Sequence, residues 1–316
     1  MPIKINFTKL LFSILLISTI NSADIKTANF DVISSEMLKK SNDKTIVVFD
    51  IDYVLVEPKD KILKYENIEE YFSLCDDIFK DCEYSSIINA FGNKILQEKN
   101  KCVDERFIEL IKKLQKKCDV ICLTDTIVGK FGNIESVPEY RVSQLKTLGY
   151  TFHSPYEKYE MDHTFKFQGN VEIRTEFKNG IIFSNRVPKG LVLKKYLEKF
   201  GKEYSSIIFI DDREKNIKSV KEVLNKKLLK EINLTTIQYI KIDECKNELT
   251  KEEIEIGKFQ LKHLRDRSIW LSDYDAKEKI KVKKQKEKLN EIRRKKRLAV
   301  KNLKLEIKEK KYRGIK

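Results

Sequence analysis

The stretch Ile46-Val47-Val48-Phe49-Asp50-Ile51-Asp52 decides the fold, because a short apolar run ends there in two carboxylates one residue apart. Apolar runs of this length are typical of strands buried on both faces of a parallel sheet. Two later runs, at residues 120–123 and 207–210, are likewise followed by polar residues, Thr124 and Asp211-Asp212. Ligands of open α/β sheets bind beyond the carboxyl ends of such strands. The sequence therefore predicts a doubly wound α/β fold with a mainly parallel sheet.

The side chains gathered at this predicted edge are those that phosphoryl transfer needs. A phosphate ester is an anion, so a carboxylate attacks it only where the repulsion is offset, as Mg²⁺ bound to carboxylates does. We expect Asp50 to attack phosphorus, forming an aspartyl-phosphate, and Asp52 to move protons as the acid and base. Thr124 would hydrogen-bond one phosphoryl oxygen, and Lys189, at the start of a predicted helix, would neutralise another. Asp211 would hold the metal.

The order of these motifs resembles the haloacid dehalogenase (HAD) superfamily of phosphotransferases. The resemblance rests on Asp50-x-Asp52-x-Val54, Thr124, Lys189-Gly190 and Asp211-Asp212, and it covers roughly residues 44–243. It implies a Rossmann-like core and a catalytic pair of Asp50 and Asp52, since an Asp at the second position is typical of phosphatases and mutases. It also implies Mg²⁺ held by the Asp50 carboxylate, the Asp52 carbonyl and Asp211, with Asp212 in support.

Two further motifs are similar to an exported HAD subgroup from intracellular bacteria. They are Pro138-Glu139-Tyr140-Arg141-x-x-Gln144-Leu145 and Asn179-Gly180-Ile181-Ile182-Phe183. This similarity implies export and phosphatase-like machinery without defining a substrate. Asn216 stands where some HAD members carry a further acidic residue.

Each motif taken alone also has a structural interpretation, because an Asp-x-Asp or Asp-Asp after a strand is a common turn and a Thr there is a common cap. Their joint order favours a site. We therefore expect an Mg²⁺-dependent phosphatase that hydrolyses a phosphomonoester, either a small molecule or a phosphoprotein. The alternative is a catalytically decayed scaffold that binds partners through its basic tail. The presence of Asp52 favours the enzyme, because binding phosphate alone requires no acid or base.

The N-terminus has the pattern of a secretory signal peptide. Lys4 and Lys9 precede an apolar stretch at residues 10–20, which is shorter than the roughly 20 residues of a membrane-spanning helix. Asn21-Ser22-Ala23 ends in small residues, so the sequence predicts a signal peptide at residues 1–23 and a mature chain from Asp24. The predicted location is periplasmic or secreted, and the alternative is an uncleaved anchor. We expect no membrane-spanning segment after residue 23.

Residues 57–103 interrupt the alternation of strands and helices within the predicted core of residues 24–250. Apolar residues recur there at helical spacing, as at Tyr71, Leu74 and Ile78, which predicts a small helical cap. Export would make one disulfide plausible in this region, among Cys75, Cys82 and Cys102. Further along, alternation at residues 171–177 followed by Asn179-Gly180 predicts a β-hairpin.

The C-terminal extension, residues 251–316, is predicted to be helical and strongly basic. Residues 277–316 contain 19 Lys or Arg and 5 Glu, a net charge of +14, whereas the whole chain has +15. Leu289 and Leu303 belong to a thin apolar stripe that is more broken than that of a regular coiled coil. The tail could bind an anionic surface, an acidic protein or nucleic acid, or it could be a solvated charged helix.

Overall fold

The computed structural model describes residues 23–152, 161–167, 171–200, 204–224, 232–241 and 248–314. The chain divides into two compact units, one formed by residues 1–59 and 100–247 and the other by residues 60–99 and 248–316. The predicted signal peptide lies outside the described residues except for Ala23, which is the first residue of a strand. Cys245 also lies outside them.

The first unit is built on a sheet that has eight strands in the part of the chain described here. From one edge to the other the order is β1, β10, β9, β2, β5, β8, β7 and β6. Their bounds are Ala23–Thr27, Asn233–Tyr239, Ser206–Asp211, Thr45–Phe49, Asp119–Thr124, Ile181–Phe183, Val171–Lys178 and Met161–Phe167. The pairs from β1 to β8 are parallel, and β8, β7 and β6 pair antiparallel. The predicted α/β class with a mainly parallel, Rossmann-like sheet is confirmed.

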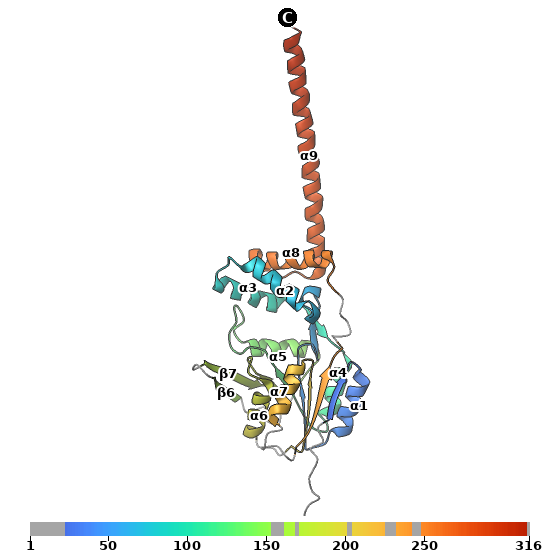
Figure 1. The fold of residues 1–316 in the computed structure, drawn as a ribbon, viewed down its shortest axis with the longest axis vertical. Coiled ribbons are helices and arrows are strands. Elements are labelled where there is room, and N and C mark those ends of the chain that lie inside the picture. The colour runs from blue at the N-terminus through green and yellow to red at the C-terminus, as the bar shows by residue number, and fades with distance from the viewer. Residues whose placement is uncertain are drawn as a thin grey trace, which may run out of the picture. The chain divides into compact units, whose positions relative to one another are not determined.

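Helices cover both faces of this sheet, because the apolar runs of the central strands are buried on both sides. In β2, Val47 and Phe49 pack into the cluster on one face, and Ile46 and Val48 pack into the cluster on the other. The first face is covered by α1 (Phe30–Lys40), α4 (Arg106–Leu114) and α5 (Val137–Thr147). The second is covered by α6 (Lys189–Phe200) and α7 (Glu214–Leu224). Figure 1 shows α1 and α4 on the side of the sheet away from α6 and α7.

The predicted hairpin is present as β7 and β8. Asn179 and Gly180 both have positive φ, 51° and 73°, as a tight two-residue hairpin turn requires. Gly180 is also constrained by packing, because a Cβ there would lie 2.8 Å from the Cβ of Phe152. The strands β1 and β6 and the helix α1 were not predicted.

A short ribbon leads from the first unit into the second. It pairs β3 (Val56–Pro58) with β4 (Asn100–Cys102) in antiparallel fashion. The loop before it is tightly wound, since the amides of Leu55 and Val56 both donate to the carbonyl of Ile51. Tyr53 adopts a left-handed φ of 64° within this loop.

The second unit is helical and combines two distant segments. Two short 3₁₀ helices (Lys61–Leu63 and Tyr65–Asn67) precede α2 (Ile68–Phe79) and α3 (Tyr84–Gln97), and α8 (Lys251–Arg267) and α9 (Asp273–Arg313) follow from the C-terminal segment. Leu74 and Ile78 pack in one core with Leu261, Leu264 and Trp270. The expected helices of the insertion and of the tail are therefore present. The sequence predicts the insertion and the tail as separate parts, whereas α8 packs against α2 and α3.

The expected disulfide among Cys75, Cys82 and Cys102 is contradicted, because all three thiols are free. Cys75 is buried in the helical unit, and this burial raises the pKa of its thiol to about 11. Among the described residues, no helix combines the length and the apolar character needed to cross a bilayer.

Candidate active site

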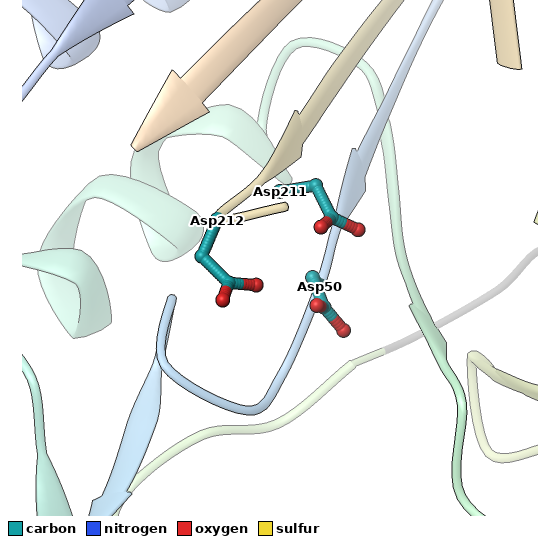
Figure 2. Close-up of side chains that lie close together, drawn as sticks. All are labelled: Asp50, Asp211 and Asp212. Atoms are coloured by element: carbon teal, nitrogen blue, oxygen red, sulfur yellow. The ribbon is translucent and has the colours of Figure 1, made fainter. Parts of the chain in front are cut away.

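Three carboxylates meet where β2 and β9 end. The two strands pair in parallel with Phe49 opposite Ile210, and the amide of Asp50 donates to the carbonyl of Ile210 at 2.9 Å. This register places Asp50 beside Asp211. Carboxylate oxygens of Asp50, Asp211 and Asp212 all lie within 4.8 Å of one another, and Figure 2 shows the three side chains directed into one space.

Lys189 forms ion pairs with two of these carboxylates. Its Nζ lies 2.7 Å from Asp50 Oδ1 and 2.7 Å from Asp211 Oδ2, and its side chain is 2% exposed. Burial alone would lower the pKa of the ammonium, but the carboxylates of Asp211 and Asp50 outweigh this effect and raise it. The sequence expectation that a lysine from the start of this helix joins the carboxylates at the strand ends therefore agrees with the geometry.

The glycine after Lys189 sets how closely its helix packs. A Cβ at Gly190 would lie 2.1 Å from the carbonyl oxygen of Ser219 in α7. The amide of Gly190 also donates a hydrogen bond to the Ser219 hydroxyl at 3.1 Å. The start of α6 thus approaches α7 at a distance that only glycine permits, and this contact positions Lys189.

Asp211 is held by a second set of donors. The amide of Arg213 donates to its Oδ1 at 2.9 Å, and the Asn216 side-chain amide lies 2.9 Å and 3.1 Å from its two oxygens. Asn216 therefore acts as a hydrogen-bond donor in this structure, a role that an ionised acidic residue could not take. This contact gives the residue a defined place in the site.

Burial and nearby negative charges raise the pKa values of Asp50 and Asp212. Burial raises the pKa of the Asp50 carboxyl well above its ordinary value, with Lys189 opposing the rise and Asp211 and Asp212 adding to it. Burial and the charge of Asp211 raise the pKa of Asp212 to about 7. A cation bound between the carboxylates would favour their ionised forms.

The group fits a divalent cation on its own donor chemistry. Mg²⁺ prefers carboxylate oxygens and waters, and it binds through a few carboxylates together with substrate phosphate. Asp212 Oδ1 is buried and has no hydrogen-bond partner among the described residues, so it is an oxygen that a ligand would satisfy. The carboxylate of Asp52 is not part of the group that the described residues form.

Asp52 is instead held by a residue from α5. Its side chain is half exposed, and its Oδ1 pairs with Nη2 of Arg141, whose Nη1 donates to Gln144 Oε1. The Thr124 hydroxyl lies 3.5 Å from Asp52 Oδ2. Arg141 and Gln144 belong to the motif at residues 138–145, which predicts no role for either side chain. Their spacing indicates that the two side chains can meet, because residues three apart on a helix lie on the same side.

A cavity of about 250 Å³ opens beside these groups. Its lining residues are Asp50, Asp52, Tyr53, Asp125, Thr126, Lys189, Asp212, Arg213 and Asn216. Thr124 is fully buried, and its hydroxyl lies 2.9 Å from that of Thr126. The sequence predicts Thr124 as a phosphate ligand, whereas Thr126 and Asp125, which directly follow it, line the cavity.

Comparison with known proteins places the chain in a family without assigning it an activity. A family described as "Protein of unknown function (DUF2608)" matches residues 26–277. The "Uncharacterized protein RP296" of Rickettsia prowazekii (strain Madrid E) is 20% identical over 203 residues, which are 64% of this chain and 73% of that protein. No solved structure matches the chain. Because the match spans most of the sequence, the chain belongs to the family of proteins of unknown function called DUF2608.

Proposed function

We propose that this protein is a phosphatase of the HAD type that hydrolyses a phosphomonoester with the help of Mg²⁺. The observation that carries the proposal is the junction of Asp50, Lys189 and Asp211, with both Lys189 contacts at 2.7 Å. Beside it lies Asp212 Oδ1, which has no hydrogen-bond partner among the described residues. These groups combine a nucleophile, a cation and a place for a metal at one strand edge. That combination is what transfer of a phosphoryl group requires.

Asp50 is the nucleophile in this proposal. Its Oδ1 accepts from the amide of Ile51 at 2.7 Å and from Lys189, which leaves Oδ2 to attack phosphorus. A bond forms between Oδ2 and phosphorus while the bond from phosphorus to the leaving oxygen breaks. When bound, Mg²⁺ would offset the charges of the carboxylates and of the phosphate, so that Asp50 reacts in its ionised form.

Asp52 is the proton donor and acceptor. It gives a proton to the leaving oxygen, and it later takes one from the water that attacks the aspartyl-phosphate and releases phosphate. Arg141 and Thr124 contact its two carboxylate oxygens and so fix their direction. Thr126, which lines the cavity, and Lys189 are the side chains available to phosphoryl oxygens.

The alternative, a binding protein that has lost catalysis, is favoured by one observation. Helix α9 is long, basic and exposed. Turnover by the purified chain separates the two functions, because a decayed scaffold would not hydrolyse any phosphate ester.

The test is hydrolysis of p-nitrophenyl phosphate by wild type, Asp50→Asn and a matched control, Asp43→Asn. Asp43 is an exposed aspartate of the same unit, outside the site. We expect turnover in Mg²⁺, its loss in EDTA, and at least about a thousandfold lower kcat for Asp50→Asn. The control should equal wild type. Near-normal turnover by Asp50→Asn would overturn the proposal. So would a folded wild-type protein that neither hydrolyses the substrate nor binds beryllium fluoride, which mimics aspartyl-phosphate, at Asp50.

A further inference from the structure

Helix α9 presents large apolar side chains to solvent along most of its length. It is one continuous helix, and Figure 1 shows it as a single straight rod. From Val282 onward its large apolar side chains are between 43% and 59% exposed. Six of these side chains recur at helical spacing: Val282, Leu289, Ile292, Val300, Leu303 and Ile307. Apolar side chains that recur on an exposed helix indicate a surface that meets something else.

These six side chains form one stripe. An α-helix turns by about 100° per residue, so Leu289 and Ile307, about five turns apart, lie on the same line along it. The other four fall within a stripe about 100° wide that includes this line, which is the width of an ordinary amphipathic face. Leu298 and Leu305 lie on other faces of the helix. Gln285 and Lys296 fall within the same arc, so the stripe is apolar except at these two positions.

A basic face without acidic residues runs along one side of the stripe. It carries Lys286, Arg293, Arg297, Lys304 and Lys308, together with Asn290, and no acidic residue among the side chains described there. The glutamates from Glu287 to Glu309 lie on the third face, where Glu291 pairs with Lys295 at 2.8 Å. The helix surface is thus divided into an apolar stripe, a basic face and a mixed face, although its overall composition is simply basic.

We propose that α9 lies on an anionic lipid surface. In this arrangement the apolar stripe enters the boundary between headgroups and acyl chains, and the basic face meets lipid phosphates. A helix with an apolar stripe bordered by Lys and Arg binds membranes in this way, through buried apolar area and attraction to anionic lipids. The net charge of +14 over residues 277–316 complements such a surface. The proposal concerns α9 alone and does not depend on the phosphatase activity.

The two other candidate occupants explain the faces less well. A second copy of α9 would bring together two helices of the same strong positive charge, which repel each other. A nucleic acid would use the basic face, since phosphate contacts supply its affinity, but it would leave the stripe exposed. A lipid surface uses both faces together.

The experiment measures binding of the full chain to vesicles of phosphatidylcholine alone and of phosphatidylcholine with phosphatidylglycerol. Two double variants change the two faces, Leu289→Ser with Leu303→Ser in the stripe and Arg293→Gln with Arg297→Gln on the basic face. The matched control, Lys288→Gln with Lys295→Gln, removes the same charge from the mixed face. Circular dichroism checks that each variant keeps its helix content, and sedimentation checks for self-association.

We expect binding to the anionic vesicles and weak or no binding to the neutral ones. The stripe variant and the basic-face variant should each lose about tenfold or more in affinity, and the control should stay within about threefold. The proposal would be overturned if the basic-face variant and the control lost the same affinity for vesicles while the stripe variant lost none. That result would show that the helix adsorbs through its overall charge. A stripe-dependent dimer, or binding to RNA without binding to vesicles, would also overturn the proposal.

Discussion

At the scale of single residues, Arg141 controls the direction of the carboxylate that the proposed reaction uses for proton transfer. Its guanidinium contacts Asp52 Oδ1 and the Gln144 side chain, and its own side chain is 11% exposed. Because Asp52 is half exposed, it would sample several rotamers without this partner. We expect Arg141→Gln to lower kcat by about tenfold to a hundredfold, since small misplacements of a reacting group cost this much. Steady-state kinetics on p-nitrophenyl phosphate measure the effect.

The values of kcat and KM distinguish a role of Arg141 in positioning Asp52 from a general loss of structure. KM should change little, because Arg141 does not line the cavity, and Arg141→Lys should recover part of the lost kcat. Lys146→Gln, an exposed change on the same helix, serves as the control and should resemble wild type. If Arg141→Gln raised KM and left kcat unchanged, Arg141 would be a substrate-binding residue.

The residues of the site differ in how well the sequence could predict them. Asp50 and Asp211 directly follow strongly apolar strands, so local pattern and sheet geometry together were enough to place them side by side. Arg141 reaches Asp52 only because α5 packs on the sheet, 89 residues further along the chain. Thr126 was missed for a different reason, because the strand ends at Thr124 and the loop that follows has no periodic signal.

At the scale of elements, the packing of α6 against α7 fixes the position of Lys189. The Ser219 carbonyl leaves no room for a side chain at Gly190, where a Cβ would lie only 2.1 Å away. We expect Gly190→Ala to lower the free energy of unfolding by about 1–3 kcal/mol, because the helices must separate to admit the methyl group. Denaturant unfolding followed by circular dichroism measures this change.

The same variant tests the link between this packing and the site. Displacing the start of α6 moves Lys189 away from Asp50 and Asp211, so the variant should also lose activity under conditions where it is fully folded. Lys195→Ala on the exposed side of α6 should change stability by no more than about 0.5 kcal/mol. A fully stable Gly190→Ala would show that α6 and α7 can move apart at little cost.

Central elements of the sheet were predictable, and its edges were not. The strands β2, β5 and β9 are buried almost throughout, so their apolar runs are distinct in the sequence. The strand β1, in contrast, alternates between half-buried and exposed residues, and in the described part of the chain it lies at the edge of the sheet beside β10. A short strand of this kind lacks the apolar signal. The β7–β8 hairpin was predictable because Asn179-Gly180 supplies a turn that requires positive φ.

At the scale of the whole molecule, the helical unit depends on contacts between segments that are far apart in the sequence. The Trp270 indole donates to Asp60 at 2.8 Å, and Arg265 donates to the carbonyl of Ile78 at 3.1 Å. Leu261 and Leu264 are fully buried in the same core. Each segment showed its helical periodicity, but periodicity does not tell which helices share a core. This explains why the sequence predicted a cap and a tail as separate parts.

Two truncations test this dependence. Removing residues 277–316 leaves α8 and Trp270 in place, whereas removing residues 248–316 takes away Leu261, Leu264 and Trp270, which the core of the helical unit needs. We expect hydrogen exchange to show amides of α2 and α3 protected in the shorter truncation and unprotected in the longer one, because those helices alone bury too little apolar surface. Amides of β2, β5 and β9 should stay protected in both, which controls for unfolding of the first unit. Protection of α2 and α3 in the longer truncation would mean that the insertion folds without the C-terminal segment, and that α8 is an addition to a cap already complete.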